Sequence, residues 1–121
     1  MEFAMEARAI AKEIRMSPRK VRLVADQIRG RSVNEAISVL QFSKKAAAIP
    51  MGKTLRSAVA NAREKADLEG DSVDIDELVI SRIFVDEGRV LKRWRAGAMG
   101  RATPRRRRTS HITVVVSTEE N

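Results

Sequence analysis

One segment of this chain concentrates side chains that can bind phosphate. From Gly88 to Arg108 there are nine basic residues and no acidic residue, and eight of the nine are Arg. A guanidinium group forms a bidentate fork on phosphate and offers a flat face to a base, whereas an ammonium group is a compact point charge. Like charges held this close repel one another, so the segment favours a polyanion as partner. Nucleic acid is the commonest polyanion, and it binds basic proteins with release of its condensed counterions.

The rest of the chain is electrically balanced. The stretch from Ser81 to His111 holds ten basic and two acidic residues, a charge of +8, and the other ninety residues hold fourteen of each sign. At 121 residues the chain fits a single domain with a modest core. That core must be mostly aliphatic, because the aromatic residues are only Phe3, Phe42, Phe84 and Trp94. So few rings argue against a protein that stacks successive bases of a single strand.

Signals for catalysis or metal binding are weak. The chain has no Cys, which excludes disulfides, thiolate catalysis and zinc ribbons. His111 is the only His and stands at the start of an apolar strand, where a structural role is the simpler interpretation. The acidic residues Asp71, Asp74, Asp76 and Glu77 lack the Gly and terminal Glu of a calcium loop, so they indicate a solvated turn. The sequence therefore predicts no enzyme, no metal and no cofactor.

Three helices are expected before the basic segment. Ser17-Pro18 is a capping hydroxyl followed by Pro at the first helical position, and Gly30 is placed to end that helix. Ser32 and Glu35 form a capping box for a second helix that ends near Gln41. A third helix is expected from Lys44 to Asp67, with Pro50 in its first turn or at a kink. The apolar stripes are predicted to contain Val21, Val24, Ala25 and Ile28; Val33, Ala36, Ile37 and Leu40; and Leu55, Ala58, Val59, Ala62 and Ala66.

Three segments have the pattern of strands. Apolar side chains alternate from Phe3 to Ala11, although the Ala content of this segment would also permit a helix. The ranges Val73–Val85 and Ile112–Val116 are rich in β-branched residues. The parity of the middle segment predicts two faces. One face would hold Val73, Ile75, Val79, Ile83 and Val85, and the other Leu78, Ile80 and Phe84.

The last two strands enclose the basic segment, whose centre at 96–100 is rich in small residues and suits a turn. With Gly97 at the tip, Phe84 would face Ser110 and Arg93 would face Arg101. The result is a hairpin with about ten residues in each arm, a reach of roughly 33 Å. It has little apolar surface to pack on a core, so we expect it to be ordered only with its partner.

RNA is favoured over DNA as the partner. The two helices between Ser17 and Leu40 leave a DNA-binding helix-turn-helix protein as the alternative. A protein of that kind carries basic residues on its second helix, and the stretch from Val33 to Gln41 has none. A long, narrow, basic hairpin is better suited to a folded RNA than to a regular duplex groove. No stretch resembles a signal peptide or a membrane span, which together with the lack of Cys predicts a cytoplasmic protein without a membrane partner.

Five motifs extend over nearly the whole chain, from about Ala7 to Ser117. They are Ser17-Pro-Arg-Lys-Val-Arg-Leu-Val-Ala-Asp26 with Ile28-Arg-Gly30, Ala60-Asn-Ala62, Val85-Asp-Glu-Gly88, Gly100-Arg-Ala102, and Arg108-Thr-Ser-His-Ile-Thr-Val-Val-Val116. In order and spacing they resemble the bacterial ribosomal protein L-twenty-two family of the large subunit. The resemblance implies an α+β fold with three helices packed on a small antiparallel three-stranded sheet and one long protruding β-hairpin. The chain 1–121 would be one domain, with a body at 1–85 and 110–121 and the hairpin at 86–109.

The resemblance also implies a function: a structural constituent of the large ribosomal subunit in the cytoplasm, without catalytic activity. Its partners would be the large-subunit rRNA, neighbouring large-subunit ribosomal proteins, among them the L-four protein, and the nascent peptide. The hairpin tip would line the nascent-peptide exit tunnel, and the protein would act in early subunit assembly.

Site residues can be carried over from the matching motifs. The implied RNA contacts are Arg19, Lys20 and Arg22 in the body and Arg89, Lys92, Arg93, Arg95, Arg101, Arg105, Arg106, Arg107 and Arg108 in the hairpin. The implied tunnel tip is Trp94, Arg95, Ala96, Gly97, Ala98, Met99 and Gly100. Family members commonly have Pro where this chain has Arg89 and Ala96, and Trp94 is unusual. His111 lies in a Thr-Ser-His-Ile motif, which suits a structural or RNA-packing role.

Overall fold

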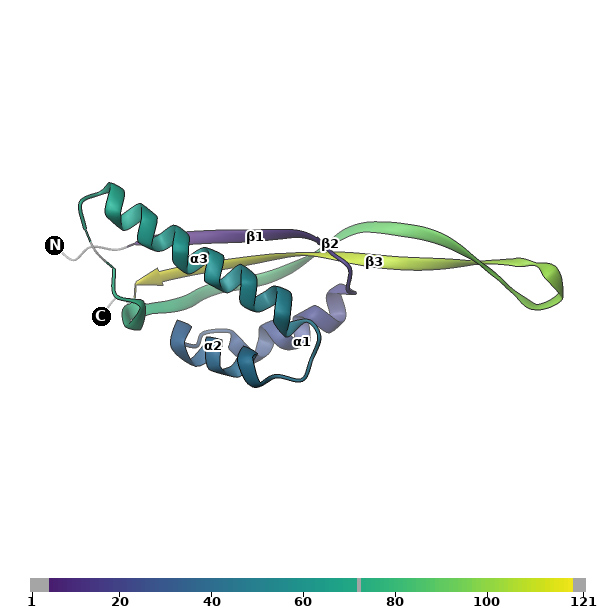
Figure 1. The fold of residues 1–121 in the computed structure, drawn as a ribbon, viewed down its shortest axis with the longest axis horizontal. Coiled ribbons are helices and arrows are strands. Elements are labelled where there is room, and N and C mark those ends of the chain that lie inside the picture. The colour runs from purple at the N-terminus through teal and green to yellow at the C-terminus, as the bar shows by residue number, and fades with distance from the viewer. Residues whose placement is uncertain (1–4, 72, 119–121) are drawn as a thin grey trace.

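The computed structural model describes residues 5–71 and 73–118 and shows an α+β body from which one two-stranded hairpin extends (Figure 1). The strands form one antiparallel sheet in the order β1-β3-β2. The predicted fold class, three helices on a small three-stranded sheet with a long hairpin, is confirmed. The elements in chain order are β1 (Glu6–Ile14), α1 (Pro18–Ile28), α2 (Val33–Phe42), α3 (Ala48–Leu68), a 3-10 turn (Ile75–Glu77), β2 (Leu78–Ala96), a second 3-10 turn (Ala98–Gly100) and β3 (Ala102–Thr118).

The predicted first strand is confirmed, and its alternation decides which face of the sheet is covered by helices. Met5, Ala7 and Ala9 are buried, while the polar residues between them are exposed. Phe3, which the same alternation included, lies outside the described residues. Within residues 5–71 and 73–118 no aromatic side chain is buried, so the described core is aliphatic, as predicted. The central strand β3 contributes Ile112, Val114 and Val116 to this core.

The outer edge of β1 is closed by side chains of α3. The amide Nδ2 of Asn61 donates to the carbonyl of Arg8 at 2.9 Å, and the ammonium of Lys65 donates to the carbonyl of Glu6 at 2.9 Å. An edge strand exposes a row of unpaired backbone groups that can pair with another chain. Two of the outward carbonyls of β1 are therefore already occupied within the molecule.

The first two helices begin and end where the sequence predicts. The hydroxyl of Ser17 accepts a hydrogen bond from the Lys20 N–H at 3.4 Å, and that of Ser32 accepts one from the Glu35 N–H at 3.3 Å. Gly30 has φ +76°, the left-handed conformation expected of a residue just past a helix. The stripe predicted for α1 is buried at every position: Val21, Val24, Ala25 and Ile28.

The third helix begins at Ala48 rather than at Lys44, so its predicted start is wrong. The reason is Pro50, which lacks an N–H and whose ring would collide with the carbonyl four residues earlier if the helix began at Lys44. In the observed helix Pro50 lies in the first turn, where neither problem arises. The predicted apolar face is confirmed and comprises Leu55, Ala58, Val59, Ala62 and Ala66.

The middle strand differs from the prediction in its start and in its parity. It begins at Leu78, not at Val73, because the preceding residues form a 3-10 turn in which the Asp74 carboxylate accepts from the Asp76 N–H at 3.0 Å. A bulge at Ser81 then inserts one extra residue between the pairs that β2 makes with β3. The bulge exchanges the two faces of the strand, so the buried residues on either side of it are Leu78 and Ile80, then Ile83 and Val85.

The predicted hairpin register is also wrong. Arg93 faces Arg105 and not Arg101, and Phe84 faces Thr113 and not Ser110. The turn is centred two residues later than predicted because left-handed conformations occur at Met99 (φ 58°) and Gly100 (φ 75°), whereas Gly97 has φ −102°. Glycine is needed at 97 for a different reason, since a Cβ there would collide with the Thr103 side chain.

Burial along β2 ends at Val85 and along β3 begins at Thr109. We call residues 86–109 the finger and the remaining described residues the body. Figure 1 shows the two arms of the finger extending well beyond the helices. Most residues of the finger are exposed. Gly88, Leu91 and Gly97 are half-buried, and Thr109 is buried.

Candidate nucleic-acid interface

The finger presents cations on both of its faces. Because directly opposed residues of a hairpin share a face, Lys92 and Arg106 lie on one face, while Arg93 and Arg105 lie on the other. Like charges placed directly opposite each other destabilise a strand pair. In the described part of the chain, all three ion pairs are in the body: Arg29–Asp26, Arg31–Glu35 and Arg82–Glu6. The finger thus has a surplus of positive charge that only an external anion can neutralise.

A groove of about 1030 Å³ lies where the finger meets the body. We call it the elbow groove. Its lining includes the apolar side chains Met16, Leu23 and Leu91. Its lining holds no acidic residue and seven basic residues, drawn from the β1–α1 connection, α1, the α2–α3 connection and both arms of the finger: Arg15, Lys20, Lys45, Arg93, Arg106, Arg107 and Arg108. Such a concave basic surface focuses the field on one bound polyanion.

Two residues of the elbow groove were missed by the sequence analysis. Arg15 lies between β1 and α1, and Lys45 lies between α2 and α3, so neither belongs to a charged run or to a motif. The fold alone brings them beside the finger. Of the predicted body contacts, Lys20 lines the groove and Arg19 is exposed on the same helix.

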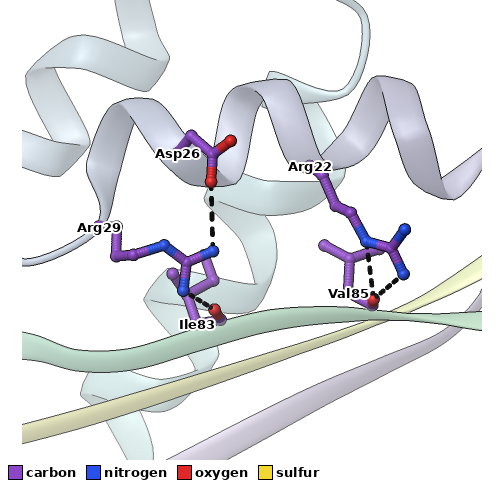
Figure 2. A network of polar contacts seen from close by, with 5 residues as sticks. All are labelled: Arg22, Asp26, Arg29, Ile83 and Val85. Carbon is purple, nitrogen blue, oxygen red and sulfur yellow. Dashed lines mark hydrogen bonds and ion pairs between the residues drawn. The ribbon is translucent and has the colours of Figure 1, made fainter.

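Arg22, predicted as an RNA contact, is engaged inside the protein. Its Nε and Nη2 donate to the carbonyl of Val85 at 3.2 and 2.9 Å. Two turns along the helix, Arg29 donates to the carbonyl of Ile83 and pairs with Asp26 at 3.3 Å. Figure 2 shows both guanidinium groups extending from α1 to the backbone of β2. These arginines hold the edge of the strand that continues into the finger, and an RNA contact by Arg22 stays a prediction.

The base of the finger is fixed by side chains of the Arg108-Thr-Ser-His motif. The Thr109 hydroxyl donates to the carbonyl of Arg89 at 2.6 Å, and the Ser110 hydroxyl donates to the carbonyl of Met16 at 2.6 Å. His111 Nδ1 accepts from the N–H of Glu13 at 3.1 Å. The motif therefore ties β3 to both of its neighbours at the point where the finger leaves the body.

Each neighbouring strand is irregular at this level. The register of β1 shifts between Ala11 and Ile14, and Glu13 has φ 56°. The register of β2 shifts between Glu87 and Val90. A Cβ built on Gly88 would lie 2.5 Å from Thr109 Oγ1, so only glycine fits there without a shift of its neighbours. Bulges of this kind re-aim a strand, and here they set the direction in which the finger points.

The weak catalytic and metal signals have structural explanations. His111 accepts a hydrogen bond from the backbone of β1 where the register of that strand shifts. Asp74 caps the first 3-10 turn, and Asp76 accepts a hydrogen bond from Asn34 Nδ2. Among the residues that the structure describes, no group of three or more His, Cys, Asp or Glu side chains could hold a metal ion. None of the described helices combines the length and apolar character needed to cross a membrane.

The remaining predicted residues lie on the finger. The arginines and the lysine predicted there are all exposed, and the loop that joins the arms is 97–101, because Ala96 and Ala102 form the last pair. Trp94 is thus not in the loop but on an arm, opposite Pro104. Met99, in the loop, is 98% exposed.

An aliphatic α+β body with an exposed arginine-rich finger defines a basic structural protein of the kind that binds nucleic acid. The family described as Ribosomal protein L22p/L17e matches residues 9–117. Over 116 residues the chain is 53% identical to the large ribosomal subunit protein uL22 of Bifidobacterium longum (strain DJO10A), which covers 96% of this chain and 98% of that protein. The identity to the uL22 protein of Bifidobacterium animalis subsp. lactis (strain AD011) is 51% with the same coverage.

The chain therefore belongs to the ribosomal protein L22p/L17e family, as its motifs predicted. It is a ribosomal protein of the large subunit. The helix-turn-helix alternative has no support, because α2 carries no basic residue and the family is ribosomal.

Proposed function

We propose that this protein binds large-subunit rRNA through its finger and its elbow groove together. The observation that carries the proposal is the elbow groove, which joins seven cations of body and finger into one concave surface without an acid. A flexible basic tail would bind polyanions without such a fixed geometry. A folded RNA segment seated at the elbow would contact Lys20 and Arg15 on one side and Arg93 and Arg107 on the other.

The finger extends this contact away from the body. From Glu87 to Ala96 it has ten residues, a reach of roughly 33 Å at about 3.3 Å per residue. Cations on both of its faces allow it to neutralise phosphates of two different RNA segments. Bridging of distant segments in this way is how we propose that the protein acts in subunit assembly.

We further propose, on the family resemblance, that the tip lines the nascent-peptide exit tunnel. The residues from Ala96 to Gly100 carry no charge, whereas Arg95 and Arg101 flank them. This stretch has no side-chain cation to pair with phosphate, so it is suited to a surface past which a peptide moves. The other proposed partners are neighbouring large-subunit proteins and the nascent peptide itself.

The test of RNA binding is a salt series with the full chain and large-subunit rRNA, with excess tRNA and duplex DNA as competitors. The variant pair Arg93→Gln and Arg107→Gln removes two cations from the elbow groove. Each lost phosphate contact lowers the slope of log affinity against log salt by about 0.7–0.9, so the double variant should lose about 1.5.

The matched control is Arg56→Gln with Arg63→Gln, which removes the same charge from two exposed positions of α3. We expect the control to keep most of the affinity. The proposal is wrong if both double variants lose affinity and slope equally, or if the competitors abolish binding by the unmodified chain.

A further inference from the structure

Trp94 is the only tryptophan of the chain, and it is 69% exposed on the finger. Single apolar side chains on a surface are common and need no explanation by themselves. This one differs in its setting, because it stands within a stretch of nine basic residues that lacks any acid. A tryptophan face attracts cations and stacks well on flat π-systems.

The register shows what surrounds the indole on its own face of the finger. Trp94 lies directly opposite Pro104, and one step toward the body Lys92 lies opposite Arg106. One step toward the tip the pair is Ala96 with Ala102. Facing side chains of such pairs are about 4.5–5.5 Å apart at Cβ. The indole therefore has two cations on its body side and only methyl groups on its tip side, where nothing large covers the ring.

We propose that Trp94 is a stacking site for one unpaired RNA base, with Lys92 and Arg106 on the adjoining phosphates. This inference rests on the proposed function, because it assumes an RNA partner, but it names the kind of RNA. Fully paired RNA hides its bases, whereas loops and bulges release single bases that stack on aromatic side chains. The small Ala96–Ala102 pair leaves room for the base, and the cation pair holds the backbone that carries it.

A peptide is the less suitable occupant. An apolar peptide could cover the indole, but it would leave the Lys92–Arg106 pair without counter-charge. A nucleotide satisfies both features at once, because it joins a flat ring to a phosphate. The scarcity of aromatic residues argues against a row of stacking rings, and a single ring is consistent with that argument.

The test uses the intrinsic fluorescence of the full chain, which reports Trp94 alone. Three probes are compared: an RNA duplex with one bulged adenosine, the same duplex fully paired, and inorganic polyphosphate. Labelled RNA gives binding independently by anisotropy. At saturation the bulged duplex should quench the emission at least twofold and protect the ring from acrylamide, while the paired duplex and polyphosphate should leave the ring accessible.

Variants separate stacking from charge. With large-subunit rRNA, Trp94→Leu should weaken binding about tenfold without changing the salt slope, because no phosphate contact is lost, and Trp94→Phe should retain most of the affinity. Lys92→Gln should lower the slope instead. Met99→Leu, at the equally apolar and more exposed tip, is the control and should change neither.

The stacking site is wrong if the bulged duplex binds by anisotropy but leaves the emission unchanged, or if polyphosphate quenches equally. It is also wrong if an uncharged apolar peptide, added as a fourth probe, shifts the emission while the bulged duplex does not. A failure of every RNA to bind by anisotropy would instead overturn the proposed function itself.

Discussion

Adding one methyl group at Gly88 should destabilise the base of the finger. In Gly88→Ala the new Cβ would lie 2.5 Å from Thr109 Oγ1 and 3.2 Å from His111 Nε2. The Thr109 side chain is 4% exposed and its hydroxyl is bonded to the carbonyl of Arg89, so it cannot turn away without losing that bond. Overpacking costs about 1–3 kcal/mol and a lost hydrogen bond costs about 0.5–1.5 kcal/mol. The expected loss of unfolding free energy is therefore about 1.5–4.5 kcal/mol.

Urea denaturation of the full chain measures this loss, and a double-mutant cycle tests its cause. Thr109→Ala removes the atom that the new methyl group meets. If the collision is the cause, Gly88→Ala should cost at least about 1 kcal/mol less in the Thr109→Ala background than in the unmodified chain. Additive costs, within about 0.5 kcal/mol, would refute the reasoning, as would a Gly88→Ala variant of unchanged stability.

Three further changes have expected outcomes. Arg22→Ala leaves a carbonyl of β2 without its guanidinium partner and should cost about 1 kcal/mol by urea denaturation, whereas Arg19→Ala on the same helix should cost less than about 0.5 kcal/mol. Ala58 is fully buried on α3, so Ala58→Leu overpacks the core. The thermal midpoint of unfolding should fall, in line with a loss of about 1–3 kcal/mol of unfolding free energy. Arg105→Glu places an acid opposite Arg93, so it should slow amide exchange in the finger, with a gain of about 0.2–1 kcal/mol, yet weaken rRNA binding.

Each of these expectations can fail in a defined way. Equal losses for the two arginine variants of α1 would show that the carbonyl bond contributes nothing. Ala60→Leu, at an exposed position of α3, is the control for Ala58→Leu, and equal midpoints for the two would contradict the packing argument. If Arg105→Glu weakens both the finger and its RNA binding, cross-strand repulsion does not limit the stability of the finger.

The features that the sequence predicted well are local ones. The caps at Ser17 and Ser32 and the left-handed Gly30 depend on a few neighbouring residues, and the structure confirms them. The basic segment needs no register to be recognised, because its charge is a property of composition. The family motifs then gave the order of the elements.

The failures involve counting along strands. One extra residue at Ser81 reverses the face of everything before it, and nothing in the local composition marks that bulge. The turn at Met99 was missed because methionine has no preference for positive φ, so the glycine at 97 was the stronger signal. The elbow groove itself was not predicted. Five of its basic residues were predicted as RNA contacts, whereas Arg15 and Lys45 become neighbours of the finger only in the folded chain.

The two outer edges of the body sheet share one property. Asn61 and Lys65 occupy carbonyls of β1, and Arg22 and Arg29 occupy carbonyls of β2. The body is thus poorly suited to accept a strand from a second molecule. Among the described residues, no side chain of the body occupies a carbonyl of the finger in this way, and repulsion between the arginines of two copies opposes pairing at its edges instead. The positive charge of the finger should therefore also keep newly made copies of the protein from joining strand to strand, and added salt should weaken that protection by screening.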